Sequence, residues 1–304
     1  MKQRTLTRLL ILALTLCMLL GTFTLGGYAA DGVVEKFPEI NFFRRPDWAQ
    51  MEVSTQSGEN TLRGYLTAPK EIEGQIPVAI LLHGLGTDNS WCDDIAWTLA
   101  DNGIASVRFD YNGTGISDGA QEDMTISSEV QDTIAMLDYV QGLKFTDPEN
   151  IFFVGKSMGA VNATLAAYER QDEVKAMVLW YPGFSVVETT RHGFLLGAFF
   201  KPWDPPPVLF AGDPFYGFYA YGRDFILEAQ ELDYEPACRA YDAPVLILHG
   251  THDLITPLFF SFKTEKLFPD CELQVIPGGM HGFWGPQEFE ALGYMMDFLK
   301  EQIG

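Results

Sequence analysis

Short, largely apolar runs recur along this chain, and segments with helical spacing separate them. The runs occupy residues 78–82, 104–109, 151–154, 174–180, 245–248 and 273–276. Runs of this length are typical of parallel strands that are buried on both faces. Between two of them, Ile126, Val130, Ile134 and Leu137 recur at the spacing of one helix face. The alternation predicts an α/β fold, in which helices cover both faces of a mostly parallel sheet.

Both ends of the alternating region carry further elements. Two strand-like runs within residues 50–68 flank the Ser-Gly-Glu-Asn sequence at 57–60, which predicts a hairpin. Asn89 or Ser90 is expected to cap the helix that follows the first apolar run, and Asp93 and Asp94 are expected to lie in its first turn. Residues 287–302 predict a closing helix, whereas residues 31–50 predict an irregular leader.

One long segment interrupts the alternation. Residues 182–236 are rich in glycine, proline and aromatic residues, and a connection of this length inside a domain is usually functional. In this position it would lie over the carboxyl ends of the strands, where open α/β sheets bind ligands. We therefore expect a cap insertion, with Trp203, Phe215 and Tyr219 as substrate-binding residues. The alternative is an insertion whose aromatic side chains only bury one another.

The N-terminus has the pattern of a secretory signal peptide. Lys2, Arg4 and Arg8 precede the apolar residues 9–20, and small residues at 27 and 29 offer a cleavage site. We therefore expect residues 1–29 to be removed and the remaining domain, residues 30–304, to be secreted or extracytoplasmic. The alternative is an uncleaved membrane anchor, although the apolar stretch is short for a full span.

Composition limits the classes of partner. The chain has 20 basic and 41 acidic residues, a formal net charge of −21, so its surface would repel nucleic acid and anionic lipid. Cys92, Cys238 and Cys271 form no C-x-x-C pair, and which of them pair, if any, stays open. The five histidines are scattered without the spacing of metal ligands. We expect no metal, no nucleic-acid partner and no stable membrane insertion after cleavage, and the oligomeric state stays open.

A serine follows the run 151–154 in the sequence Gly155-Lys156-Ser157-Met158-Gly159. This G-x-S-x-G pattern between a strand and a helix is typical of a nucleophile elbow, which exposes the serine Oγ at the carboxyl edge of the sheet. Glycines flank the serine because the turn is tight. A strand–turn–helix connection without a catalytic role would look similar.

A serine nucleophile needs a histidine base and a carboxylate that orients the base. In sites built on such an elbow, the order along the chain is serine, acid, histidine. Asp253 follows the run 245–248, and His281, in a glycine-rich loop after 273–276, is the only histidine beyond it. Ser157, Asp253 and His281 therefore form the candidate catalytic triad.

Acyl transfer also requires N–H donors for the oxyanion that develops on the substrate. One donor is expected to be the backbone N–H of Met158, directly after the nucleophile. The second is expected in His83-Gly84-Leu85-Gly86, after the first apolar run, and we assign it to the Leu85 N–H. Gly84 could also serve, or line the substrate site. The alternative for this segment is a plain turn at the end of a strand.

The remaining candidates have structural interpretations. His249 and His252 are expected to orient the acid loop through hydrogen bonds, and His192 to lie in the cap insertion. The glycine-rich loop 110–119 lacks a phosphate-binding motif and is expected to border the active site as a structural loop.

With these motifs assembled, the chain resembles a known family. Its segments 83–86, 110–119 and 155–159, with His249-Gly250-x-x-Asp253 and Gly279-x-His281, together resemble α/β-hydrolases of the serine aminopeptidase S33/monoglyceride lipase-like group. Within that group, the motifs and the sequence Gly222-Arg223-Asp224-Phe225 are most similar to bacterial cinnamoyl and feruloyl esterases. The resemblance covers roughly residues 50–303. It implies an eight-stranded α/β-hydrolase core with a small cap, no cofactor, and ester hydrolysis through an acyl-enzyme.

Three departures from that family affect the pocket. Lys156 stands where the family usually has histidine or glutamine, and Gly113-Thr114-Gly115 stands where Gly-His-Gly is common. The cap insertion is also long and unusually aromatic. None of these departures removes a catalytic group, but each bears on substrate choice.

The residues and the resemblance together predict a secreted serine carboxylesterase that acts on small acyl or hydroxycinnamoyl (feruloyl-type) esters. One alternative is an aminopeptidase or monoacylglycerol lipase on the same triad. An aminopeptidase would need a carboxylate for the substrate amine, which Glu228, Glu231, Asp233 or Glu235 could supply. The other alternative is a non-catalytic binding protein that has kept the fold.

Overall fold

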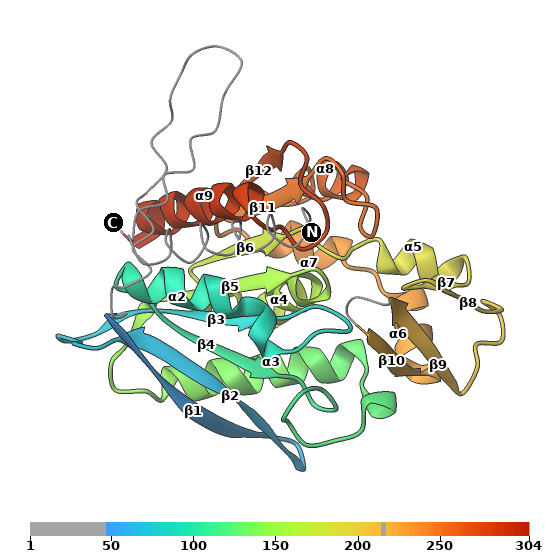
Figure 1. Cartoon of the computed structure of the whole chain (residues 1–304), viewed down its shortest axis with the longest axis horizontal. Coiled ribbons are helices and arrows are strands. Elements are labelled where there is room, and N and C mark those ends of the chain that lie inside the picture. Colours follow the sequence, from blue (N-terminus) through green and yellow to red (C-terminus); the bar gives the residue numbers. More distant parts are fainter. Residues whose placement is uncertain (1–46, 214–216, 304) are drawn as a thin grey trace, which may run out of the picture. The chain divides into compact units, whose positions relative to one another are not determined.

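An eight-stranded sheet forms the centre of the computed structural model, which describes residues 47–213 and 217–303 (Figure 1). The strands lie in the order β1 (Trp48–Ser57), β2 (Asn60–Pro69), β4 (Ala105–Asp110), β3 (Ile76–Leu82), β5 (Thr146–Lys156), β6 (Ala176–Trp180), β11 (Val245–Gly250) and β12 (Cys271–Ile276). Only β2 runs antiparallel to its neighbours, β1 and β4. The predicted eight-stranded, mostly parallel α/β sheet is confirmed. The predicted signal peptide lies outside the described residues.

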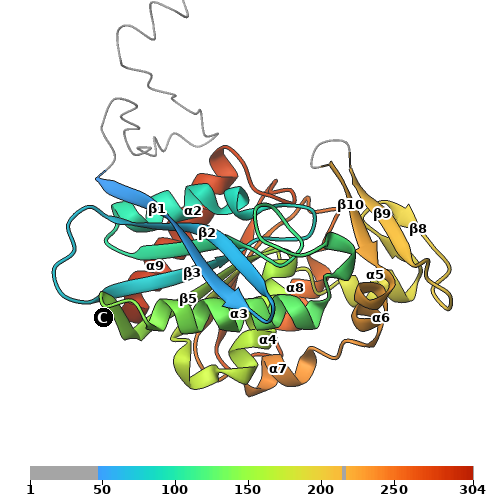
Figure 2. The same ribbon diagram turned by 90° about the horizontal axis from the view of Figure 1, so that it is seen from below.

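Helices cover both faces of this sheet (Figures 1 and 2). On one face lie α2 (Asp93–Asp101) and α9 (Pro286–Ile303), which bury their apolar sides in one core cluster. The other face carries α3 (Ile126–Gln141), α4 (Met158–Glu169) and α7 (Glu235–Ala240). The remaining core elements are α8 (Phe259–Glu265) and the 3-10 turns η1 (Asn89–Cys92), η2 (Gln121–Asp123) and η3 (Gln171–Glu173). In the described chain, no helix is long and apolar enough to span a membrane.

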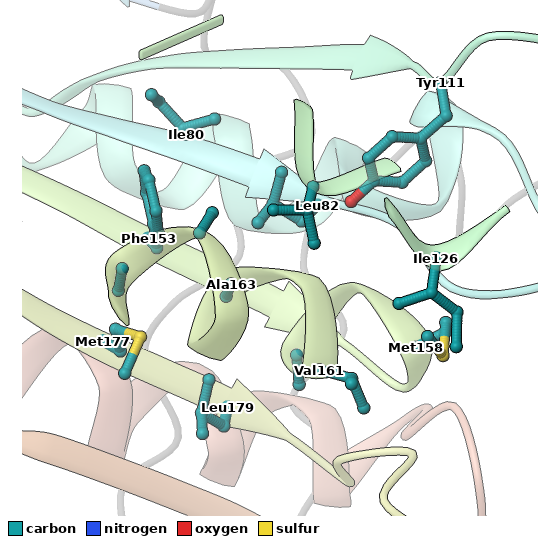
Figure 3. Packing of buried hydrophobic residues seen from close by; sticks show 14 of the residues in the cluster. Ile80, Leu82, Tyr111, Ile126, Phe153, Met158, Val161, Ala163, Met177 and Leu179 are labelled. Atoms are coloured by element: carbon teal, nitrogen blue, oxygen red, sulfur yellow. The ribbon is translucent and has the colours of Figure 1, made fainter. Parts of the chain in front are cut away.

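Side chains of the central strands alternate between these two cores. On β3, Ile80 and Leu82 pack with the cluster beneath α3 and α4, whereas Ala79 and Leu81 pack with the cluster beneath α2 and α9. Successive side chains of a strand point to opposite faces, so a strand buried on both faces must be apolar throughout. Figure 3 shows Ile80 and Leu82 with Phe153 of β5 and with Val161 of α4. This arrangement explains the unbroken apolar runs of the sequence.

Helix termini show where the sequence prediction was wrong. Asp88, and not Asn89 or Ser90, caps the turn before α2, because its side chain accepts a hydrogen bond from the Ser90 N–H at 2.9 Å. The Asn89 amide instead donates to Asp110 Oδ2 at 2.9 Å. Asn89 therefore makes a tertiary contact with β4 and does not cap the helix. Residues 31–46 of the predicted leader lie outside the described residues, and residues 48–50, predicted to be irregular, already belong to β1.

The insertion between β6 and β11 folds as a small subdomain. Its elements are α5 (Val186–Arg191), β7 (Phe194–Leu195), β8 (Ala198–Phe199), β9 (Val208–Asp213), β10 (Gly217–Gly222) and α6 (Arg223–Glu231). In the β9–β10 hairpin, Leu209 and Tyr221 are buried on one face, whereas Phe210 and Phe218 are exposed on the other. The insertion therefore has a buried inner surface and an apolar outer surface.

A buried carboxyl group lies on α3. Glu129 is only 3% exposed, and its Oε2 accepts a hydrogen bond from the Asn162 amide of α4 at 3.0 Å. Burial raises the pKa of Glu129 to about 8, although the hydrogen bond from Asn162 opposes the rise. Glu129 is therefore protonated in the folded protein at neutral pH, whereas in an unfolded chain it would be ionised.

This difference makes stability depend on pH. Between about pH 4.5 and about pH 8 the folded protein keeps the proton that the unfolded chain releases, so stability should fall as pH rises and level off above about pH 8. Glu129→Gln removes the contribution of Glu129 to the pH dependence of stability. The melting temperature of this variant should therefore fall less between pH 5 and pH 8 than that of the wild type. Thermal unfolding at both pH values measures the difference. Glu169→Gln, at an exposed position of α4, is the control; equal pH dependence in all three proteins would contradict the assignment.

Candidate active site

Ser157 sits on a strained turn between β5 and α4. Its φ is +55°, a value that residues other than glycine rarely adopt. The flanking glycines permit the turn, because a Cβ at Gly155 would lie 2.4 Å from the Gly159 carbonyl oxygen. A Cβ at Gly159 would in turn lie 2.2 Å from the carbonyl oxygen of Leu82. Close packing within the elbow excludes a side chain at Gly155, and close packing of the elbow against β3 excludes one at Gly159.

Three side chains from separate loops meet at this turn. His281 Nε2 lies 3.0 Å from Ser157 Oγ, and His281 Nδ1 lies 2.8 Å from Asp253 Oδ2. Ser157 follows β5, Asp253 follows β11 and His281 follows β12, so all three lie at the carboxyl ends of parallel strands. The structure thus brings the three residues of the candidate triad into one hydrogen-bonded chain.

Asp253 is held as an anion in a buried loop. Its Oδ1 accepts hydrogen bonds from the N–H groups of Ile255 and Thr256, at 2.9 and 2.8 Å. Burial acts to raise the pKa of Asp253, but hydrogen bonds from His249 and His281 outweigh it and hold the pKa well below its ordinary value. A carboxylate in this state can orient His281 and stabilise its protonated form.

His249 supports this acid, as the sequence predicted. It is fully buried, and its Nε2 donates to the Thr256 carbonyl at 2.7 Å and lies 3.4 Å from Asp253 Oδ2. Its Nδ1 is therefore free to accept from the Ser261 hydroxyl at 2.6 Å. His252 is exposed. Its backbone N–H donates to the Gly279 carbonyl, in the loop that carries His281. His192 closes α5 within the insertion.

The loop after β3 is shaped to present a backbone donor. The Gly84 carbonyl accepts hydrogen bonds from the Thr87 hydroxyl at 2.8 Å and from His83 Nδ1 at 3.0 Å. In a trans peptide the next N–H points the opposite way, so the Leu85 N–H faces away from these two partners. The other expected donor, the Met158 N–H, lies at the N-terminus of α4. Backbone N–H groups at a helix N-terminus favour negative charge.

Gly84 lies directly against the nucleophile. A Cβ at this position would lie 2.9 Å from Ser157 Cβ and 2.7 Å from the ring of Trp91. Gly84 therefore has a packing role at the site whether or not it also touches substrate.

The glycine-rich loop after β4 is structural, as predicted. Asp110 is buried, and it accepts hydrogen bonds from the N–H groups of Asn89 and Ile116 at 2.6 and 2.8 Å. Gly115 must lack a side chain, since a Cβ there would lie 2.0 Å from Asp110 Oδ2. Thr114, which replaces the common histidine, lies 3.4 Å from His83 Nε2 through its hydroxyl.

The three aromatic residues that the sequence suggested as substrate contacts have different placements. The Tyr219 ring lies 3.0 Å from the position of a Cβ on Gly86, so it packs over the loop after β3. Trp203 is 81% exposed and packs on no part of the site. Phe215 lies outside the described residues. Of the two that the structure describes, Tyr219 therefore lies at the edge of the candidate site and Trp203 does not.

Sequence reasoning missed the aromatic surroundings of His281. Its ring centroid lies 4.7 Å from that of Tyr181 and 6.2 Å from that of Trp91. Lys156 is buried and anchors Trp91, since its Nζ donates to the Trp91 carbonyl at 2.6 Å and lies 5.3 Å from the centroid of the Trp91 ring. The unusual lysine before the serine was the available signal, but nothing in the sequence linked it to residue 91.

The described residues also locate the cysteines and acidic residues that the sequence analysis considered. Among the described residues, no group of three or more histidine, cysteine, aspartate or glutamate side chains could hold a metal ion. Cys92, Cys238 and Cys271 are free thiols. Two of the acidic residues considered for an aminopeptidase are engaged elsewhere: Glu228 accepts from the Ser127 N–H, and Glu235 pairs with Lys263.

Comparison with known proteins places the chain among hydrolases. A family model described as "Serine aminopeptidase, S33" matches residues 76–203. A solved structure of Est1E from Butyrivibrio proteoclasticus with ferulic acid bound is 30% identical and superposes with a TM-score of 0.77. The match covers 83% of this chain and 99% of that chain.

Two curated relatives are more distant. The mitochondrial palmitoyl-protein thioesterase ABHD10 of Homo sapiens is 26% identical over 252 residues, which are 78% of this chain and 77% of that protein. An uncharacterized protein of Mycobacterium tuberculosis is 26% identical over 238 residues, which are 77% of this chain and 72% of that protein.

Gly84→Ala should displace Ser157 and Trp91 from their positions in the site. Because the added methyl would meet both Ser157 and Trp91, the reaction of Ser157 with a fluorophosphonate should slow by about 100-fold, the scale expected for a displacement of about 1 Å. Gly293→Ala is the matched control, since a Cβ on this α9 glycine meets nothing within 4 Å. Equal labelling rates in the two variants would contradict this account of the site.

Proposed function

Because the chain belongs to the serine aminopeptidase S33 group of α/β-hydrolases, we propose that it is a serine carboxylesterase acting on small acyl or hydroxycinnamoyl esters. The hydrogen-bonded chain from Asp253 through His281 to Ser157 carries the proposal. It joins a nucleophile, a base and an orienting carboxylate in the geometry that covalent catalysis requires.

The reaction follows from the roles of these groups. Ser157 Oγ attacks the ester carbonyl while His281 Nε2 accepts its proton, and Asp253 stabilises the imidazolium that forms. His281 then donates this proton to the departing alkoxide, which leaves as the alcohol and gives an acyl-enzyme. A water molecule, activated by His281, attacks the acyl carbonyl and releases the acid.

In this proposal the oxyanion of each tetrahedral intermediate is bound by two backbone donors. These are the N–H groups of Met158 and Leu85. The orientation of the Gly84 carbonyl away from the donor side supports the assignment of Leu85. Fixed backbone donors need no reorganisation as charge develops, which is why such donors contribute strongly to rate.

The proposed acyl preference rests on two observations. Est1E, with its bound ferulic acid, matches this chain over 99% of its own length. In addition, Tyr219 of the insertion packs over the loop that carries Leu85, so an aromatic side chain lies where it could contact an acyl group. The thioesterase relative makes acyl thioesters a further class to test, because the same triad chemistry applies to them.

Ser157→Ala should lower kcat/KM for the preferred ester by about four orders of magnitude or more. The assay uses p-nitrophenyl acetate and butyrate, methyl ferulate, a palmitoyl thioester and an amino-acid anilide. Ser54→Ala, at an exposed position on β1, is the control and should retain wild-type turnover. Hydrolysis that survives in Ser157→Ala would overturn the proposed nucleophile, and cleavage of the anilide alone would favour a peptidase.

We also propose that residues 1–29 direct export and are removed. The basic start, the apolar stretch and the small residues near position 29 support this. Expression of the full chain in a bacterial host should give extracytoplasmic protein whose N-terminus lies close to residue 30. N-terminal sequencing checks this, and a purified protein that still begins at Met1 would contradict it.

A further inference from the structure

We infer that Tyr181 is a positioning residue that holds the loops of Ser157, Asp253 and His281 in their reactive arrangement. The inference rests on the proposed function of these three residues. Tyr181 lies directly after β6, the strand between β5, which carries Ser157, and β11, which carries Asp253. It is therefore central among the loops that form the site.

The backbone around Tyr181 clamps the elbow. The Ser157 N–H donates to the Trp180 carbonyl at 2.9 Å, and the Ser157 carbonyl accepts from the Gly183 N–H at 2.8 Å. Both backbone groups of the nucleophile are thus bound by the turn that contains Tyr181. Gly183 packs tightly here, since a Cβ at this position would lie 3.0 Å from the Met158 nitrogen and 3.2 Å from the Ser157 carbonyl oxygen.

Tyr181 has a strained conformation of its own. Its φ is +35°, which is unfavourable for a residue with a Cβ and persists only where surrounding contacts impose it. The Tyr181 N–H donates to the Leu248 carbonyl of β11 at 2.7 Å. The Tyr181 carbonyl lies 3.3 Å from the Thr256 hydroxyl, which also donates to Asp253 Oδ2 at 2.9 Å. The strained turn is therefore hydrogen-bonded to β11, the strand that leads into the acid loop, as well as to the elbow.

The side chain completes the arrangement by contacting the base. The buried Tyr181 ring lies 4.7 Å from the His281 ring, at an interplanar angle of 58°. It also packs edge-on against Phe283, two residues beyond His281, at 5.0 Å. This ring limits the movement of the imidazole, and an aromatic surface near an imidazolium also favours its positive charge. The ring should therefore matter most in the step in which His281 accepts the proton.

Tyr181→Leu removes the ring and keeps the strained backbone. We expect kcat for the preferred ester to fall by about 10- to 100-fold, the scale of a misplaced base, with KM within about twofold. Tyr181→Phe keeps the ring and should retain kcat within about threefold. Tyr241→Leu is the control for loss of a buried tyrosine: its hydroxyl donates to the Val174 carbonyl at 2.9 Å in the core beneath α4, and it should lose stability but not kcat.

A second variant removes the ring together with the backbone strain. Tyr181→Gly also lacks the ring, but glycine adopts φ of +35° without strain, which offsets part of the stability that is lost with the ring. It should show the same loss of kcat. Proton NMR adds a readout: the downfield signal of the His281–Asp253 hydrogen bond, identified by its absence in Asp253→Ala, should persist in Tyr181→Phe and weaken in Tyr181→Gly.

The outcomes distinguish this inference from the proposed function. Equal ester hydrolysis by the wild type and Ser157→Ala would overturn the proposed function. Hydrolysis that depends on Ser157 but is unchanged in Tyr181→Leu or Tyr181→Gly would overturn only the role of Tyr181. A loss of kcat in Tyr181→Phe as large as that in Tyr181→Gly would show that the ring is not the part that acts.

Discussion

The strained backbone of Ser157 is the constraint on which the rest of the site depends. A positive φ at a serine persists only because β3, α4 and the turn after β6 hold the elbow on all sides. Gly155 and Gly159 allow these segments to approach within distances that no Cβ would tolerate. In return, the turn projects the Ser157 hydroxyl out of the sheet edge, where a base from another strand can reach it.

The parallel strands of the sheet bring these groups together. β5, β6, β11 and β12 are consecutive neighbours in the sheet, so the loops that follow them leave the same edge. Ser157 and His281 are 124 positions apart in sequence yet lie within hydrogen-bond distance. The apolar cores on both faces keep these strands in register, and this packing fixes the positions of the loops that form the site.

The sheet edge also carries polar groups that are costly to bury unless they are paired. Asp253 is ionised and buried, and its charge is matched by backbone N–H groups and by His249 and His281. Glu129, on α3, is buried with one amide partner and is protonated instead. Burial favours the neutral form of both carboxyl groups, and only Asp253 faces enough donors to outweigh it.

The sequence alone determined the class of fold and the order of the candidate catalytic residues along the chain. Apolar runs marked the buried strands, and the G-x-S-x-G turn with Asp253 and His281 after later strands named the groups that the structure brings together. These signals are local, since each depends on residues within a few positions of one another. Tertiary structure decided the rest: the cap at Asp88 instead of Asn89, the exposure of Trp203, and the packing of Tyr181 and Trp91 around His281. Those features arise from contacts between segments that are distant in the chain, and no local pattern records which segments will meet.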